Sequence, residues 1–369
     1  MIKALYLGGF ELPDKNAAAH RVKGVGKILS LQGVSVFYSG IYRGDTSNLD
    51  NQIKYPSSIS EWFKYLFSSR QWIKIIEETN PSLVILYNFP AISSKKIIKY
   101  CKKNNIKILG DITEWYTAEG NIIFRCIKGF DIWMRMRVIN YRYDGLITIS
   151  KYLTDFYSEK IKTFEIPPVN SLGNKILKNS VNEEQCLKLV YSGSPGKSKD
   201  YLRIIIDSLY DLRENKFVYT IIGQTKESFL EFNPEYNLPL SELGEKVIFL
   251  GRIEHQQALD FISNNDFSLF VRENNRTVKA GFPTKLTEAI SLGIPVITNP
   301  HSNVSDFLID GVNSIVIKSL TKEGVTDALR RVMKMDRSEI ENMKNSIDRN
   351  QFCPENYLEK LSVEEVIKC

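Results

Sequence analysis

The segment Ala280–Thr298 holds an informative spacing of glycine, proline, lysine and glutamate. It reads AGFPTKLTEAISLGIPVIT, with Pro283 shortly after Gly281. Proline suits the first turn of a helix, where no amide hydrogen has to be donated. The free amides and positive dipole end of such a helix favour a bound phosphate. Glu288 lies one turn further in, where a carboxylate can accept both hydroxyls of a ribose.

The alternative for this segment is an ordinary capped helix. In that interpretation Glu288 is exposed to solvent, and Lys285 alone is more typical of a solvated helix residue. Local physics leaves the two interpretations open.

Candidates in the first half of the chain follow predicted strands. Gly9 lies in a strand-to-loop turn, but no GxGxxG spacing follows, which disfavours NAD binding. His20 and Arg21 open the first predicted helix, and Asp111 and Glu114 follow another strand. Ligands of open α/β sheets bind at the carboxyl ends of strands. We therefore expect these four side chains to contact a ligand of the first half of the chain, the acceptor of any group that is transferred. The alternatives are a structural histidine and plain helix capping.

The 369 residues are more than a single core usually holds and suit two domains. No apolar run approaches the ~20 residues of a membrane span, and residues 1–10 are typical of a first strand, not a signal peptide. Five cysteines without CxxC spacing argue against a disulfide framework or zinc site. We therefore expect a cytoplasmic protein.

The positive charge is concentrated in the first half of the chain. Residues 1–165 hold 24 Lys and Arg against 15 Asp and Glu, whereas the remainder holds 25 against 28. This suggests an anionic partner on the first side, such as a membrane surface or a phosphorylated acceptor, although a solvated lysine-rich face is the alternative. Residues 124–137 mix aromatic and basic side chains, typical of peripheral membrane contact or of a buried helix with outward-reaching arginines. The charge is not arranged for nucleic-acid binding.

Short apolar runs alternate with helical patterns in both halves, which predicts parallel sheets built from βαβ units. The predicted strands are 3–7, 34–38, 83–87, 107–111, 145–149, 188–191, 217–222, 246–250, 267–270, 295–298 and 314–317. The predicted helices are 18–31, 94–104, 200–214, 256–264, 283–292 and 322–335, followed by a helical, charged tail over 338–369. The fold class is therefore α/β, with two Rossmann-like, doubly wound domains facing a central cleft.

The proline-rich stretch 166–173 is the best candidate for a linker. It gives a first domain over 1–168 and a second domain over 169–350. We expect residues 351–369 to form a C-terminal helix that packs back on the first domain.

The segment 280–298 resembles the donor-site motif of the retaining GT-B glycosyltransferases of family 4. Further similar motifs occur in the family's order, and they cover most of the chain. They are Leu7–Gly9, Ala17–Arg21, Asp144–Ser150 with Ile166–Pro168, Val190–Asp200 and Phe249–Ile253 with His255 and Asn264–Phe270. The resemblance implies a sugar transferred with retention from a nucleotide-diphosphate donor to a glycan or lipid-linked acceptor. It makes 1–168 the acceptor-side domain and 169–350 the nucleotide-sugar-binding domain.

The resemblance also implies roles for residues of the second half. The donor-binding set is Gly9, Ser194, Arg252, Lys279, Gly281, Phe282, Pro283, Thr284 and Glu288. The catalytic set, which stabilises the leaving diphosphate, is Lys197, Lys199 and Arg276. No carboxylate is assigned as an enzymic base.

The sequence departs from the family pattern in two places. Ser194 stands where the family usually has an arginine, and the missing charge has to come from Arg272, Arg276 or Lys279. Ala280 stands where the family often has a glutamate that touches the donor sugar, which leaves the sugar open. No DxD-like pair stands at a strand end, so no metal cofactor is expected.

Bacterial surface polysaccharide synthesis, at the inner face of the membrane, is the setting that the resemblance favours. Two other functions stay open. One is a nucleotide-sugar epimerase on the same fold, and the other is a non-catalytic, donor-binding partner.

Overall fold

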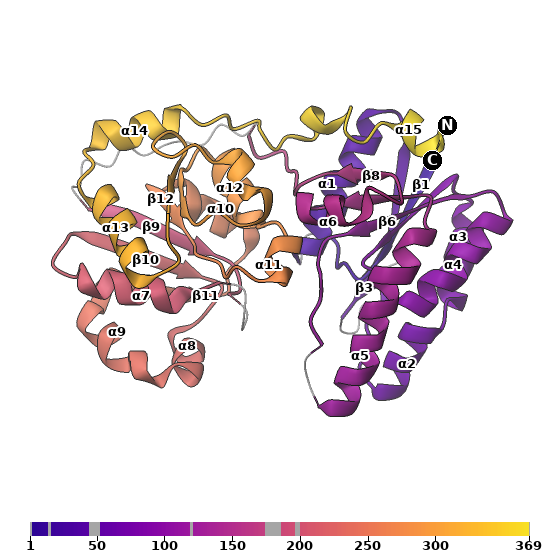
Figure 1. Ribbon diagram of the computed structural model, residues 1–369, viewed down its shortest axis with the longest axis horizontal. Coiled ribbons are helices and arrows are strands. Elements are labelled where there is room, and N and C mark those ends of the chain that lie inside the picture. The colour runs from indigo at the N-terminus through magenta and orange to yellow at the C-terminus, as the bar shows by residue number, and fades with distance from the viewer. Residues whose placement is uncertain are drawn as a thin grey trace. The chain divides into compact units, whose positions relative to one another are not determined.

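The computed structural model describes residues 2–13, 16–43, 52–118, 121–173, 186–195 and 200–368. The chain divides into two compact units, each built on its own sheet (Figure 1). Unit 1 comprises Met1–Val169, Lys279–Phe282 and Pro354–Cys369, and unit 2 comprises Asn170–Val278 and Pro283–Cys353. The expectation of two α/β parallel-sheet domains is confirmed.

The sheet of unit 1 has the order β2-β1-β5-β6-β7-β8, and every neighbouring pair is parallel. A parallel sheet is buried on both faces, and its central strands are accordingly near-continuous apolar runs. The strands are β1 (Lys3–Gly8), β2 (Ser35–Ser39), β5 (Leu83–Tyr87), β6 (Lys107–Ile112), β7 (Gly145–Thr148) and β8 (Thr163–Glu165), with a separate pair β3 (Ile41–Tyr42) and β4 (Ile53–Lys54). The edge strand β8 was not among the predicted strands, because three residues are too few for a pattern.

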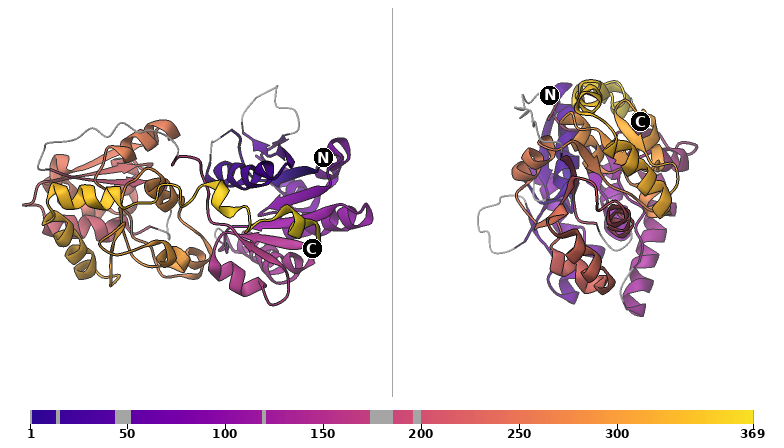
Figure 2. Two further views of the ribbon diagram at one scale, coloured as in Figure 1. Left: turned by 90° about the horizontal axis from the view of Figure 1, so that it is seen from above. Right: turned by 90° about the vertical axis from the view of Figure 1, so that its left-hand side faces the viewer.

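Helix α1 (Ala17–Leu31) begins where the Asn16 side chain accepts a hydrogen bond from the Ala19 amide. Its apolar side and the C-terminal segment after Pro354 pack in one core with β1, β5, β6 and β7 (Figure 2). Gln32, just after α1, fastens that segment by accepting from the Val363 amide and donating to the Leu361 carbonyl. The other helices of unit 1 are α2 (Ile59–Phe67), α3 (Arg70–Thr79), α4 (Ala91–Lys103), α5 (Ile122–Met134), α6 (Lys151–Tyr157) and α15 (Val363–Lys368).

The sheet of unit 2 is also fully parallel, with the order β11-β10-β9-β12-β13-β14. Its strands are β9 (Leu187–Ser192), β10 (Phe217–Ile222), β11 (Val247–Gly251), β12 (Phe267–Leu269), β13 (Val296–Thr298) and β14 (Ser314–Val316). Its helices are α7 (Leu202–Asp211), α8 (Lys226–Phe232), α9 (Asn237–Leu243), α10 (His255–Ser263), α12 (Thr284–Ser291), α13 (Lys322–Met333) and α14 (Arg337–Asn345), and α11 (Arg276–Ala280) bridges the two units.

Helix α12 differs from its prediction in two details. It begins at Thr284, so Pro283 is the capping residue with an extended backbone and not the first helical residue. Lys285 is buried, which overturns the expectation of a solvated lysine. Gly293 follows the helix with φ of +77°, a left-handed conformation that favours glycine.

Candidate active site

A buried group of charges lies at the carboxyl ends of β9, β12 and β13 in unit 2. At its centre is Asp200, whose side chain is 2% exposed. Its Oδ1 lies 2.8 Å from Nε of Arg272, and its Oδ2 lies 2.6 Å from Nζ of Lys285. The hydroxyl of Tyr191 donates to the same Oδ2 over 2.7 Å. We call Tyr191, Asp200, Arg272 and Lys285 the Asp200 cluster.

The backbone around Arg272 is fixed by its neighbours. Asn299, directly after β13, accepts from the Arg272 amide at 2.8 Å and donates to the Arg272 carbonyl at 2.9 Å. Arg272 also forms an isolated antiparallel bridge with Asp200. The ends of neighbouring strands are therefore joined at the point where the cluster lies, as expected for the ligand-binding edge of an open α/β sheet.

Lys285 reaches the cluster from the first turn of α12. Its Nζ lies 4.0 Å from the ring centroid of Tyr191 and 5.5 Å from that of Phe270, so the aromatic faces also stabilise the ammonium. Gly193 follows β9 with φ of +140°, and a Cβ atom added there would lie 3.4 Å from Nζ of Lys285. The ammonium group therefore lies beside the turn at the end of β9.

The charges shift one another's pKa in a consistent way. Burial alone raises the pKa of Asp200, but Lys285 and Arg272 outweigh burial and lower it to about 2. Burial is the main cause that lowers the pKa of Lys285 to about 8; Asp200 opposes this shift, and Arg272 adds to it. The ion pair favours the charged form of both partners, but for Lys285 burial and the competing guanidinium of Arg272 outweigh it, whereas Asp200 faces two cations.

His301 lies next to these charges and is 4% exposed. Burial, with Arg272 next in importance, lowers the pKa of the imidazole to about 4, so the ring is neutral at pH 7. Its Nδ1 lies 2.8 Å from the Asn299 carbonyl and donates to it, which leaves Nε2 as an acceptor. No described residue hydrogen-bonds to Nε2, although that atom is buried.

Glu288 lies one turn beyond Lys285 on α12, as the sequence indicates. Its carboxylate is 3.2 Å from Nε2 of His255, which comes from α10, and its side chain is 18% exposed. Glu288 is therefore neither a solvated surface residue nor part of the core. The contact with ribose stays a prediction.

The other predicted donor-side residues differ in whether they adjoin the Asp200 cluster along the chain and in how exposed they are. Lys197 and Lys199 lie outside the described residues. Ser194 adjoins Gly193, and Pro283 and Thr284 adjoin Lys285. Arg252, after β11, and Arg276, which opens α11, are exposed. Among the three cations named as substitutes for the missing arginine, Arg272 contacts Asp200 in the cluster.

Three further predicted residues, Lys279, Gly281 and Phe282, belong to unit 1. Ala280 between them is fully buried, and its carbonyl accepts from the Ser150 hydroxyl at 2.8 Å. A glutamate at this position would place a carboxylate where the chain now buries a methyl group.

The predicted acceptor-side residues Arg21 and Asp111 form a buried pair inside unit 1. Nη2 of Arg21 lies 3.0 Å from Oδ1 of Asp111, and the Tyr6 hydroxyl donates to Oδ2 at 2.5 Å. Arg21 also donates to the carbonyls of Ile166 and Pro167, at 2.5 and 2.9 Å. The pair therefore fastens the segment at Ile166 and Pro167 to α1.

The other predicted acceptor-side residues, His20, Glu114 and Gly9, are half-buried near the same strand ends. The acceptor role of all these residues stays a prediction.

The sequence analysis did not single out Asp200, Tyr191 or His301. Lys285 lies in the motif that the sequence did single out, but its burial was not predicted. Its carboxylate partner is 85 residues away, and no local pattern identifies such a pair.

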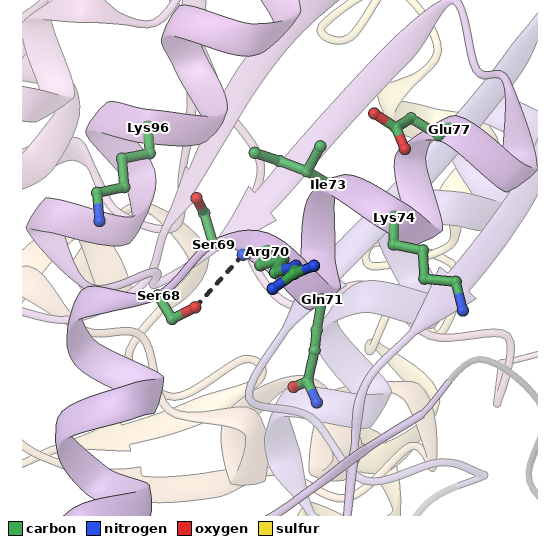
Figure 3. Close-up of a pocket in the computed structure, with 8 residues that line it drawn as sticks. All are labelled: Ser68, Ser69, Arg70, Gln71, Ile73, Lys74, Glu77 and Lys96. Carbon is green, nitrogen blue, oxygen red and sulfur yellow. Dashed lines mark hydrogen bonds between the residues drawn. The ribbon is translucent and has the colours of Figure 1, made fainter.

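A hollow on the surface of unit 1 shares no residue with the Asp200 cluster (Figure 3). It is lined by Ser68, Ser69, Arg70, Gln71, Ile73, Lys74, Glu77 and Lys96. In Figure 3 the side chains of Arg70, Gln71 and Lys74 splay apart. Lys96 donates a hydrogen bond to the Phe67 carbonyl. This arrangement shows no convergence of polar groups on one point.

Two further features were searched for among the described residues. No three His, Cys, Asp or Glu side chains there gather closely enough to hold a metal ion. None of the helices in the described ranges is both long and apolar enough to cross a membrane.

Comparison with known proteins agrees with this geometry. Residues 175–350 match the family model described as glycosyl transferases group 1. An uncharacterized glycosyltransferase of Methanocaldococcus jannaschii is 22% identical over 241 residues, which are 61% of this chain and 57% of that protein. The match thus spans little more than half the length of that relative.

Solved structures resemble nearly the whole chain. Sucrose-phosphate synthase from Thermosynechococcus elongatus has a TM-score of 0.72 and 15% identity, over 98% of this chain and 97% of that one. WaaG, a glycosyltransferase involved in lipopolysaccharide biosynthesis, has a TM-score of 0.62 and 15% identity, over 98% of this chain and 100% of that one. The chain therefore has the GT-B glycosyltransferase fold, and its second half is similar to the glycosyl transferases group 1 family.

Proposed function

We propose that the chain transfers a sugar, with retention and without a metal cofactor, from a nucleotide-diphosphate donor held by unit 2. The acceptor is a glycan or a lipid-linked sugar of a bacterial surface polysaccharide. The observation that carries the donor assignment is the Asp200 cluster, in which two cations share one carboxylate at the ligand-binding edge of the sheet. Glu288, one turn further along α12, suits the ribose of the same nucleotide.

Breaking the bond between sugar and diphosphate leaves negative charge on the β-phosphate oxygen. Preorganised cations and amides near that oxygen stabilise the charge as it develops, each by about 10²–10³ in rate. Arg272 and Lys285 are held by hydrogen bonds and aromatic contacts, so little reorganisation is needed when the donor arrives. Side-chain cations of this kind can stabilise a diphosphate in place of a metal ion.

The group 1 family match supports a glycosyl transfer. The resemblance of the donor-site motif to retaining enzymes supports retention, and the similarity to WaaG supports a role in surface polysaccharide synthesis. The protein would then act at the inner face of the membrane.

An apolar and basic surface on α5 supports membrane contact. Ile122, Phe124, Phe130 and Trp133 are each between 45 and 77% exposed, and Arg125 is exposed between them. Aromatic and aliphatic side chains mixed with arginine suit the interface of an anionic bilayer. We call these five residues the α5 surface.

The membrane proposal is tested by sedimentation with lipid vesicles. We expect wild-type protein to sediment with vesicles containing phosphatidylglycerol, and a Phe130→Ser/Trp133→Ser variant to bind at least tenfold more weakly. Leu238→Ser, which removes an exposed leucine of unit 2, is the control. Equal binding by all three proteins would remove the α5 surface from the proposal.

The donor proposal is tested by thermal unfolding with a panel of UDP-, GDP-, ADP- and TDP-sugars. A bound donor raises the unfolding temperature by mass action. We expect one nucleotide to give a shift in wild type, with and without EDTA, and Glu288→Ala to lower the affinity by about tenfold through loss of the ribose contact. Glu227→Ala in α8 is the matched control.

Product analysis with the same donors separates the three functions. Transfer or slow hydrolysis with retention of the anomeric configuration supports the proposal. Formation of an epimer without acceptor would favour the epimerase, and donor binding without turnover across all acceptors would favour a non-catalytic partner. Absence of any donor binding would overturn the proposal.

A further inference from the structure

We propose that Lys285, held in place by Asp200, is the side chain that neutralises the diphosphate of the donor. The proposal rests on the donor function above and assigns its cation to α12. Asp200 is then a positioning residue, which touches no substrate atom and acts through Lys285.

The first support is the position of the Lys285 ammonium. Strand β9 ends in a turn that carries Gly193 and Ser194, neither of which has a charge. The Lys285 Nζ supplies a positive charge beside this turn, since it lies within van der Waals distance of a Cβ built on Gly193. The Lys285 backbone is in the first turn of α12, where a helix leaves backbone amides without helical partners. We therefore infer that a phosphate beside the ammonium is also drawn toward this end of the helix.

The second support is the charge balance of the Asp200 cluster. Among the described residues, Asp200 is the one carboxylate that contacts either Arg272 or Lys285. The adjoining His301 is neutral at pH 7. The cluster therefore carries an excess positive charge, although Asp200 and Lys285 are almost wholly buried. A buried charge without a partner is unfavourable, and an incoming anion relieves it.

The third support is the way Asp200 is bound. Tyr191 and Arg272 hold its two oxygens, and Lys285 shares Oδ2 with Tyr191. The carboxylate therefore cannot turn away from Lys285 without losing another hydrogen bond. Asp200 fixes the ammonium at the end of β9 and keeps it protonated.

These contacts predict a pH dependence of diphosphate binding. The groups that act on Lys285 are Asp200 and Glu288, which favour its charged form, and Arg272, which opposes it. With a pKa of about 8, Lys285 loses its charge as the pH rises from 7 to 9.5. A phosphate is already fully ionised in that range, since its second pKa is about 6. Affinity for a nucleoside diphosphate should therefore fall with rising pH.

The experiment compares a nucleoside diphosphate with its nucleoside by calorimetry, using the base that the donor panel selects. We expect Lys285→Met to weaken diphosphate binding by about 10- to 100-fold, the range for a hydrogen bond to a charged group. Nucleoside binding should stay within twofold, and Lys285→Arg should recover part of the loss. Lys322→Met, which removes an exposed lysine of α13, is the control.

Asp200→Asn tests the positioning role. Loss of the carboxylate lowers the pKa of Lys285 further, so diphosphate affinity should begin to fall at least one pH unit lower than in wild type. A merely structural effect would weaken binding by the same factor at every pH. Asp211→Asn, at an exposed ion pair, is the matched control.

The outcomes separate this inference from the donor proposal. Wild-type diphosphate affinity in a folded Lys285→Met variant would overturn the role of Lys285 and leave the donor function intact. If that variant does not fold, the wild-type profile decides, because an affinity that is flat from pH 7 to 9.5 would also overturn the role. A wild-type protein that binds no nucleoside diphosphate would refute the donor function itself.

Discussion

Each unit buries one carboxylate at the carboxyl ends of its strands, with a tyrosine hydroxyl and an arginine as partners. In unit 1, Asp111 has Tyr6 and Arg21, and the remaining contacts of Arg21 go to two backbone carbonyls. In unit 2, Asp200 has Tyr191 and Arg272, and Lys285 is added. The first arrangement is neutral and the second is positive by one charge.

The difference separates a structural ion pair from the proposed binding site, although both lie near the carboxyl ends of strands in a parallel sheet. Arg21 and Asp111 satisfy each other and the chain end around Ile166, so an additional anion gains nothing there. The Asp200 cluster in unit 2 has one cation more than its carboxylate can balance. Fold position alone therefore does not distinguish the two arrangements, whereas their charge balance favours the proposed site in unit 2.

The largest expected effect is on the neutral pair. Asp111→Ala leaves the Arg21 guanidinium buried without its carboxylate, and removal of one partner of a buried pair costs about 3–5 kcal/mol. All four tryptophans lie in unit 1, so the urea midpoint of tryptophan fluorescence measures this loss. Asp155→Ala, at an exposed position of α6, should leave the midpoint unchanged. A loss below about 1 kcal/mol for Asp111→Ala would contradict the structural role.

The next effect is the pH dependence of unit 2. The pKa of Asp200 is about 2 in the folded state, against about 4 in the unfolded state. Its ionisation therefore stabilises unit 2 above pH 4, and this contribution is lost as the pH falls toward 2. The loss is on the order of 2 kcal/mol. The folded pKa of Lys285 is depressed to about 8, so stability rises as the pH increases from 8 toward 10.5.

Circular dichroism detects the unfolding of both units, and tryptophan fluorescence detects unit 1 alone. The unfolding step seen by the first method and not by the second belongs to unit 2. In the Lys285→Met variant, the rise in the stability of unit 2 above pH 8 should disappear, while the unfolding step seen by fluorescence keeps its wild-type pH dependence. A gain that persists in this variant would show that another group titrates.

Much of the fold follows from the sequence. Predicted and observed strands agree within one residue at most ends, because buried parallel strands are continuous apolar runs with turn residues between them. The missed strand β8 and the short helices α8 and α9 are held by tertiary contacts, which outweigh the propensity of three to seven residues.

The site is less predictable from sequence than the fold. The place of Glu288 on α12 follows from helix spacing, since it comes three positions after Lys285, and its contact with ribose stays a prediction. The pairing of Lys285 with Asp200 depends on strand order in the sheet, and the burial of Arg21 with Asp111 depends on the packing of α1. Residue type predicts a charge at these positions, but whether that charge is free for a ligand is decided by partners far away in the sequence.

The smallest expected effect is the difference between the stability losses caused by substituting the two tyrosines. Burial, and after it the neighbouring aspartate, raises the pKa of both Tyr6 and Tyr191 well above the usual value, so each remains a protonated donor. Tyr6→Phe and Tyr191→Phe each remove one hydrogen bond to a carboxylate, which costs about 1.5–3 kcal/mol. We expect Tyr191→Phe at the lower end of this range, because two cations still hold Asp200, and Tyr6→Phe at the upper end, because Arg21 alone holds Asp111. The two unfolding steps measure the losses separately, and a larger loss in unit 2 than in unit 1 would contradict the proposed excess of positive charge around Asp200.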